Sequence, residues 1–204
     1  MRVLVTGATG FVGGHTAAAL ARQGHEVVAL VRDPGRLAAV ATSLDVTLPE
    51  HVVGDMADPG AVGKALDGVD AVVHCAAVVS LDRRDEDRIL AANLAGLRTV
   101  VAGAVEAGVG RVLYTSSTSA LFRPGAGPLT VAFPVSPATA GYGRAKAACE
   151  TEVRRLQARG APVVTTYPSG ILGPAAGAAL GETATAMARF VAGARALIDG
   201  YLGN

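Results

Sequence analysis

Six short apolar runs recur along the chain, and each is bounded by glycine, proline or charged residues. Their side chains are largely β-branched, and apolar and polar residues do not alternate within them. A strand with one face in solvent shows such alternation, so these runs are typical of strands buried on both faces, as in a parallel sheet covered by helices. The six predicted strands span residues 2–6, 26–31, 51–54, 70–76, 111–117 and 162–168.

Segments with helical periodicity separate the runs, and several of them stop at a glycine such as Gly24 or Gly160, a residue suited to a helix C-terminus. Regular alternation of strand and helix predicts an α/β fold with right-handed crossovers and a doubly wound parallel sheet. Residues 123–141 are rich in Gly and Pro and are expected to form a long loop. The predicted helices span residues 11–24, 35–41, 59–68, 84–108 and 139–159.

Composition narrows the classes of protein. Of 204 residues, 50% are hydrophobic and 17% are charged, which supports a large buried core and argues against disorder. The net charge of +1 provides no field for nucleic acid or an anionic membrane. Glycines and charges interrupt every apolar run, so no membrane span is expected. Cys75 and Cys149 lack metal-like spacing, so we expect no metal site, buried packing for both thiols and a cytoplasmic protein.

A glycine cluster, "VTGATGFVGG", follows the first strand and opens the first helix, with Gly7, Gly10 and Gly13 spaced three apart. In this context the first glycine allows a tight turn, the second lets the backbone approach a pyrophosphate, and the third lets helix and strand pack closely. The helix N-terminus then offers free N–H groups to the phosphates. The cluster predicts a dinucleotide site in a Rossmann sheet; the alternative is a purely structural turn.

The end of the second strand bears on which dinucleotide is bound. An acidic residue there binds the ribose 2′-hydroxyl of NAD, whereas an arginine accommodates the 2′-phosphate of NADP. The chain reads "ALVRDPGR", so Arg32 comes first, with Asp33 next and Arg36 close by. Arg32 favours NADP, and Asp33 keeps NAD as the alternative. Asp55, after the third strand, would lie beside the adenine or begin the next helix.

The stretch "YGRAK" places Tyr142 and Lys146 four residues apart, on one face of a predicted helix. Alone, such a pair more often lies on a solvated helix surface. After a dinucleotide turn, it can instead point into the cleft at the carboxyl ends of the strands. A nearby ammonium favours the phenolate and would lower a tyrosine pKa of about 10.

With these pieces together, the chain resembles the extended short-chain dehydrogenase/reductase family. The resemblance rests on "TGATGFVG", "GDMADP", "DAVVHCAA", "NLAGLRTV", "RVLYTSS", "YGRAK" and "YPSGILGP", which occur in the family's order over residues 1 to about 175. It implies that Tyr142 is the catalytic acid/base, with Lys146 beside it and on a ribose hydroxyl. Ser117 would polarise the substrate oxygen, with Ser116 and Thr118 close enough to replace it. The cofactor contacts so expected are Gly7, Thr9, Gly10, Phe11, Val12, Gly13, Arg32, Asp55, Met56, Ala76, Ala77, Asn93, Thr115, Pro168, Gly170 and Ile171.

The resemblance also discriminates between branches of the family. Sugar-nucleotide dehydratases carry an Asp-Glu pair just after the active-site hydroxyl, and epimerases commonly keep a Tyr-Gly pair a few residues on. This chain has "SSTSALFR", with Leu121 and Phe122 at the latter positions. The motifs look more like the dihydroflavonol-reductase and 3β-hydroxysteroid-dehydrogenase-like group. We therefore expect an NADP-dependent carbonyl reductase or alcohol dehydrogenase for a small apolar substrate, with two alternatives: an NAD-dependent epimerase/dehydratase, or a non-catalytic NADP-binding regulator.

Family members are usually considerably longer than this chain. The resemblance implies a dinucleotide-binding domain over residues 1–175 and the start of a substrate lobe over 176–204, including a helical stretch at about 181–198. Helices such as those at 84–108 and 139–159 pair in many relatives, so a homodimer through them is an expectation.

Overall fold

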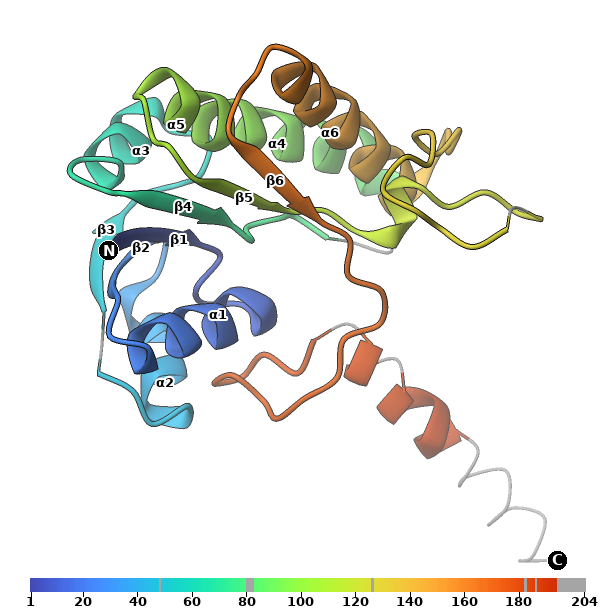
Figure 1. Ribbon diagram of the computed structural model, residues 1–204. Helices are drawn as coiled ribbons and strands as arrows, with labels where there is room; N and C mark the ends of the chain where they lie inside the picture. Colours follow the sequence, from blue (N-terminus) through green and yellow to red (C-terminus); the bar gives the residue numbers. More distant parts are fainter. Residues whose placement is uncertain (48, 80–82, 126, 182, 186, 194–204) are drawn as a thin grey trace, which may run out of the picture.

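The structure is a computed structural model that describes residues 1–47, 49–79, 83–125, 127–181, 183–185 and 187–193. In this part of the chain, six strands pair in parallel in the order β3-β2-β1-β4-β5-β6 (Figure 1). The chain runs outward from β1, crosses back to β4 and runs outward again, which confirms the predicted doubly wound sheet. The strands are β1 (Arg2–Thr6), β2 (Glu26–Val31), β3 (Glu50–Val53), β4 (Ala71–His74), β5 (Val112–Thr115) and β6 (Val163–Thr166).

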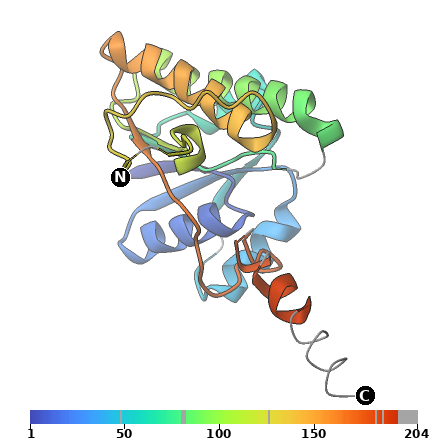
Figure 2. The same ribbon diagram turned by 90° about the vertical axis from the view of Figure 1, so that its right-hand side faces the viewer.

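The helices cover the sheet in two layers (Figures 1 and 2). On one face lie α1 (Phe11–Arg22) and α2 (Pro34–Ser43). The other face carries the described helices that connect β3, β4, β5 and β6 in turn. They are α3 (Pro59–Ala65), η1 (Arg83–Asp85), α4 (Glu86–Leu97), η2 (Arg98–Ala102), α5 (Gly103–Glu106) and α6 (Gly141–Ala158). A short turn of helix, η3 (Thr118–Ala120), follows β5.

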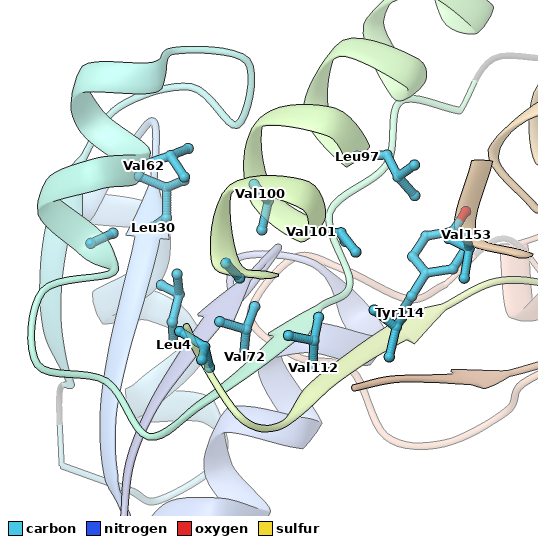
Figure 3. Packing of buried hydrophobic residues seen from close by; sticks show 14 of the residues in the cluster. Leu4, Leu30, Val62, Val72, Leu97, Val100, Val101, Val112, Tyr114 and Val153 are labelled. Atoms are coloured by element: carbon cyan, nitrogen blue, oxygen red, sulfur yellow. The ribbon is translucent and has the colours of Figure 1, made fainter. Parts of the chain in front are cut away.

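Burial on both faces explains why the strands read as unbroken apolar runs. Within β1, Leu4 points into the cluster beneath α3, α4 and α6, whereas Val3 and Val5 point into the cluster beneath α1. Figure 3 shows Val72 and Val112 continuing the first cluster across β4 and β5. Each face of the sheet therefore packs against its own layer of helices in a separate apolar cluster.

The predicted helix at 84–108 is not uniform. After α4, the segment η2 is a π-helix, in which each bond spans one residue more than in an α-helix. The stretch Glu86–Glu106 is long and apolar enough, by length and composition, to cross a membrane. The expectation that charges and glycines interrupt every such run is therefore wrong by this measure. In the fold, Leu97, Val100 and Ala104 of this stretch pack in the core, which accounts for its apolar face.

After β6 the chain returns beneath the sheet to α1 and α2. Ala176 is buried in a cluster with Val40 and Leu44, and the Gly177 N–H donates to the Ser43 hydroxyl at 2.6 Å. Residues 183–185 and 187–193 are helical. The rest of the expected second lobe and of the helical stretch at 181–198, namely residues 182, 186 and 194–204, lies outside the described residues.

Candidate active site

The glycine turn packs without space for side chains. Gly7 has a φ of +74°, and a Cβ on it would lie 2.7 Å from the Ala76 nitrogen. A Cβ on Gly13 would lie 2.3 Å from the Gly7 carbonyl oxygen. Contacts below about 3 Å are excluded for a real Cβ, so α1 can approach β1 and β4 this closely only because these positions are glycine. This geometry accounts for two of the three glycines in the motif.

Gly10 has another role at the N-terminus of α1. It is the N-cap residue, and without a side chain it leaves the first turn of the helix without a side-chain acceptor. Its Cβ position meets only the Gly7 carbonyl oxygen, at 3.3 Å. The N-terminus of α1 is therefore open, with N–H groups and the positive end of the helix dipole facing the carboxyl edge of the sheet.

A cleft of about 380 Å³ opens at this edge, beside the neighbouring strands β1 and β4, from which the chain order runs toward opposite ends of the sheet. Ligands bind at such a switch point in doubly wound sheets. The cleft brings together eight of the predicted cofactor contacts: Gly7, Thr9, Gly10, Arg32, Asp55, Met56, Ala76 and Ala77. A larger hollow, about 900 Å³, lies between α3 and the η2–α5 segment. None of the predicted site residues line this hollow, and its size alone does not identify it as a functional site.

Sequence reasoning missed several residues that line the cleft. Arg88 comes from the start of α4, and Cys75 and Val78 follow β4. Cys75 is only half-buried, which corrects the expectation of buried packing, whereas Cys149 is buried as expected. Nothing in the local sequence distinguishes Arg88 from other charges at a helix start. Arg88 reaches the cleft only because α4 starts beside the end of β4 in the folded chain.

The charges after β2 have distinct partners. Arg32 is 73% exposed and forms an ion pair with Asp55 across the cleft, at 3.8 Å. Asp33 instead caps α2, because one carboxylate oxygen accepts the N–H groups of Gly35 and Arg36 at 2.9 and 3.2 Å. The acidic residue that could have bound a ribose is thus engaged with the backbone, and the guanidinium faces the cleft.

A buried polar chain fixes the end of β4. The Thr6 hydroxyl accepts the Ala76 N–H at 3.2 Å and shares a hydrogen bond with Nδ1 of His74 at 2.7 Å. Burial, and then the charge of Lys146, lower the pKa of His74 to about 3, so the imidazole is neutral at physiological pH. This chain holds Ala76 against the glycine turn.

Asn93 lies behind the wall of the cleft. Its side-chain oxygen accepts the Val78 N–H at 2.8 Å, and its amide nitrogen donates to the Val78 carbonyl at 2.9 Å. Asn93 therefore ties α4 to the segment after β4. Asn93 is buried and positions the lining rather than lining the cleft itself.

Lys146 and Tyr142 lie on the first turns of α6, where that helix meets the end of β5. Lys146 is only 5% exposed, and burial lowers the pKa of its ammonium. Its Nζ donates to the Thr115 carbonyl oxygen at 3.1 Å and lies 5.8 Å from the centroid of the Tyr142 ring. The predicted pair is therefore adjacent in space, and its amine is buried rather than solvated.

The same strand end joins this pair to the cleft. Thr115 offers its carbonyl to Lys146, and its hydroxyl lies 3.3 Å from the sulfur of Cys75, which lines the cleft. Ser117, the next predicted site residue, is 8% exposed, and its hydroxyl accepts the Ser119 N–H at 3.2 Å. The Ser116 hydroxyl is directed elsewhere, to Glu150 at 3.2 Å. This geometry favours Ser117 over Ser116 for a substrate oxygen.

Other predicted contacts occupy supporting positions. Phe11 is buried, with its ring 3.3 Å from the Cβ position of Gly173. The Val12 carbonyl accepts from Thr16 within α1, and the Pro168 carbonyl accepts the Thr118 N–H at 3.0 Å. Gly170 and Ile171 follow β6 and are not among the residues that line the cleft.

Comparison with known proteins adds an independent finding. The model of the NAD dependent epimerase/dehydratase family matches residues 3–198. Over 176 residues the chain is 36% identical to sterol demethylase protein B of Methylococcus capsulatus, which covers 85% of this chain and 52% of that protein. It is 34% identical over 173 residues to the Synechocystis protein named "Putative dihydroflavonol 4-reductase", with 83% and 49% covered.

A solved structure agrees with these matches. The chain is 34% identical to a short-chain dehydrogenase/reductase superfamily protein from Agrobacterium tumefaciens with bound NAD. The two superpose with a TM-score of 0.68, over 82% of this chain and 48% of that one. The chain spans about half the length of the curated relatives it matches.

Proposed function

Because the chain belongs to the NAD dependent epimerase/dehydratase family, as its motifs indicated, we propose that it uses a nicotinamide dinucleotide for hydride transfer to or from a small apolar molecule. The reaction would be reduction of a carbonyl or oxidation of an alcohol. The observation that carries this proposal is the buried ammonium of Lys146, which donates to the Thr115 carbonyl and lies 5.8 Å from the centroid of the Tyr142 ring.

The residues present fit such a cofactor. The glycine turn and the open N-terminus of α1 suit a pyrophosphate, because backbone N–H groups there have no side-chain cap. Asp55 and Met56 would hold the adenosine end, and Ala76 and Ala77 would line the path toward the nicotinamide. The chemistry that this cofactor supplies is the transfer of hydride to or from carbon.

The protein's own residues would move the proton and position the oxygen. In the direction of reduction, the Tyr142 phenol donates its proton to the substrate oxygen, and the Ser117 hydroxyl polarises that oxygen. The Lys146 ammonium stabilises the negative charge left on the phenol. One N–H of the Lys146 ammonium donates to the Thr115 carbonyl. The ammonium has two further N–H donors for a ribose hydroxyl.

The preferred cofactor is proposed to be NADP. Arg32 faces the cleft with most of its side chain exposed, and Arg36 also lines it. A 2′-phosphate would gain charge-assisted bonds from these guanidinium groups. Asp33 caps α2 through one carboxylate oxygen and is not among the residues that line the cleft, which argues against it as a ligand for the 2′-hydroxyl of NAD. The Agrobacterium relative was solved with NAD, which keeps the alternative testable.

The test is NADPH oxidation with phenanthrenequinone, an apolar diketone, as the probe. Tyr142→Phe should lower turnover by roughly 10²- to 10⁴-fold, the range for loss of a general acid, without loss of nucleotide binding. Lys146→Met should also lower turnover, whereas Lys64→Met, an exposed lysine on α3, should not. Undiminished turnover in Tyr142→Phe would remove the proposed acid.

The same assay separates the alternatives. Nucleotide binding without turnover of this or other carbonyl probes would favour a regulatory binding module. Preference for NADH, with turnover only of sugar nucleotides, would favour the epimerase/dehydratase reading.

A further inference from the structure

Glu150 is a charged residue at a fully buried position, where charged side chains are rare. It lies on α6, four residues after Lys146 and eight after Tyr142, so the three share one face of the helix. Its side chain is 0% exposed. Carboxylates are almost never fully buried unless they are paired, so this position calls for an account of what the charge contacts.

The carboxylate accepts bonds from three separate segments. One oxygen accepts from the Tyr167 hydroxyl at 2.6 Å and from Nε of Arg154 at 2.8 Å. The other accepts from the Ser116 hydroxyl at 3.2 Å. Burial, followed by the bond to Glu150, raises the pKa of Tyr167, so this phenol stays protonated and donates.

Two of these donors adjoin the candidate active site. Ser116 is the neighbour of Ser117, and its N–H donates to the Thr166 carbonyl at 2.8 Å. Tyr167 is the neighbour of Pro168, whose carbonyl accepts the Thr118 N–H at 3.0 Å. The ends of β5 and β6 are thus tied to each other by backbone bonds and to α6 by Glu150.

Stability alone does not explain the carboxylate. Desolvating an ion pair is costly, and apolar replacements of similar volume are often neutral or stabilising. What an apolar side chain lacks is direction: it cannot fix two hydroxyls from two strands at defined points.

We propose that Glu150 is a positioning residue: its carboxylate fixes the ends of β5 and β6 against α6 and so places the Ser117 hydroxyl relative to Tyr142 and Lys146. The inference rests on the proposed hydride transfer for what is being positioned. It predicts that loss of the carboxylate affects turnover more than nucleotide binding, because the glycine turn lies on other strands.

The experiment compares Glu150→Ala, Glu150→Gln and the control Glu152→Gln. Glutamine can keep the bonds from Arg154 and Tyr167 on its oxygen and donate its amide to the Ser116 hydroxyl, which can also accept. Glu152 lies on the same helix and pairs with Arg98 and Arg155 at the surface. Turnover of phenanthrenequinone, nucleotide KM and melting temperature are measured for each.

Glu150→Ala should lower kcat roughly 10- to 100-fold, as misplacement of a catalytic group by about 1 Å can, with nucleotide KM nearly unchanged. Glu150→Gln should restore most of the loss, and Glu152→Gln should match the unmodified protein. If Glu150→Ala does not fold, two one-arm variants replace it: Ser116→Ala and Tyr167→Phe, which each remove one hydrogen bond to the Glu150 carboxylate. Each should lower kcat by a smaller factor. Unchanged kcat in Glu150→Ala or in both one-arm variants, or parallel loss of kcat and nucleotide binding, would overturn the inference.

If the unmodified protein shows no turnover, the proposed function is contradicted. Hydrogen exchange then tests the positioning role of Glu150 independently of turnover. Glu150→Ala, or the one-arm variants in its place, should speed exchange at the Ser116 and Thr118 amides while β1 and β2 keep their protection. Glu150→Gln should not. Equal exchange at those amides in all variants would contradict the positioning role.

Discussion

Two helices that begin at the same edge of the sheet differ at their N-termini. Both α1 and α2 follow a parallel strand and lie on the same face (Figure 1). In α2 the first N–H groups are bound by the Asp33 carboxylate, with Pro34 in the first position. In α1 the corresponding place is Gly10, and neither a side-chain cap nor a first-turn acid is present. One terminus is closed by the chain itself, and the other is open to an external anion.

The difference shows how an apparent defect can mark a site. With glycine as its N-cap, α1 forgoes a few tenths of a kcal/mol relative to a helix that a side chain caps. α3 resembles α2, since the Asp58 carboxylate accepts the Gly60 N–H at 2.8 Å. Of these three helices, only α1 has an N-terminus that lacks a side-chain cap and borders the cleft. Its glycines leave both the N-terminus and the cleft unobstructed by side chains.

The largest effect should come from closing the space behind the turn. Gly13→Ala forces a Cβ to within 2.3 Å of the Gly7 carbonyl, so the turn must move. We expect a loss of roughly 1–3 kcal/mol in the free energy of unfolding, as for overpacking, together with loss of nucleotide binding. Denaturant titration and nucleotide fluorescence measure these.

Gly63→Ala is the matched control for Gly13→Ala. Gly63 lies in α3 with nothing within 4 Å of its Cβ position, so alanine there should stabilise the protein by roughly 0.5–1 kcal/mol. Equal effects of the two substitutions would show that helix propensity, not the turn, governs this position.

A second change would make α1 resemble α2. Gly10→Asp adds an acidic cap at a φ of −99°, which an aspartate adopts freely. Folding should be nearly unaffected, because aspartate and glycine caps differ by only a few tenths of a kcal/mol. Affinity for NADPH should fall by about 100-fold or more, since like charges in contact cost several kcal/mol.

Gly10→Ala separates charge from size in that comparison, because it adds the Cβ without the carboxylate. It should retain far more affinity than Gly10→Asp in the same fluorescence titration. Similar losses in the two variants would indicate steric exclusion. A salt titration of both variants separates the two causes, because only a charge effect shrinks at high ionic strength.

The smallest effect should come from opening α2. Asp33→Ala removes the cap and should lower the free energy of unfolding by about 1 kcal/mol, with NADPH affinity unchanged. Thermal melts and nucleotide titrations measure the two quantities. Selective loss of NADH affinity would instead identify Asp33 as a ribose ligand and reverse the proposed cofactor preference.

The sequence predicted the part of the site that depends on local pattern. The strand–turn–helix context identified the glycines, and the i, i+4 spacing placed Tyr142 and Lys146 on one face. The predicted elements match the observed ones apart from their ends, because hydrophobic periodicity reports the core that strands and helices share. The predicted strand at 70–76 ends at His74 because the chain then turns outward to line the cleft.

What the sequence did not reveal depends on tertiary contacts. In the π-helical segment η2, each backbone hydrogen bond spans one residue more than in an α-helix. This change cannot be predicted from an apolar run of residues. Arg88 enters the cleft only through the path of α4. Glu150 does have a sequence signal, because it continues the Tyr142 and Lys146 spacing by one more turn and so places a second charged residue beside Lys146 on the buried face of α6.

The most direct test of the account is a fluorescence titration with NADPH and NADH of the unmodified protein, Arg32→Ala and the control Arg159→Ala, an exposed arginine at the far end of α6. The account predicts that NADPH binds more tightly. Arg32→Ala should weaken NADPH roughly 10- to 100-fold, the value of a charge-assisted bond, and leave NADH and the control unchanged. Absence of binding by either nucleotide would contradict the central claim that this cleft is a dinucleotide site.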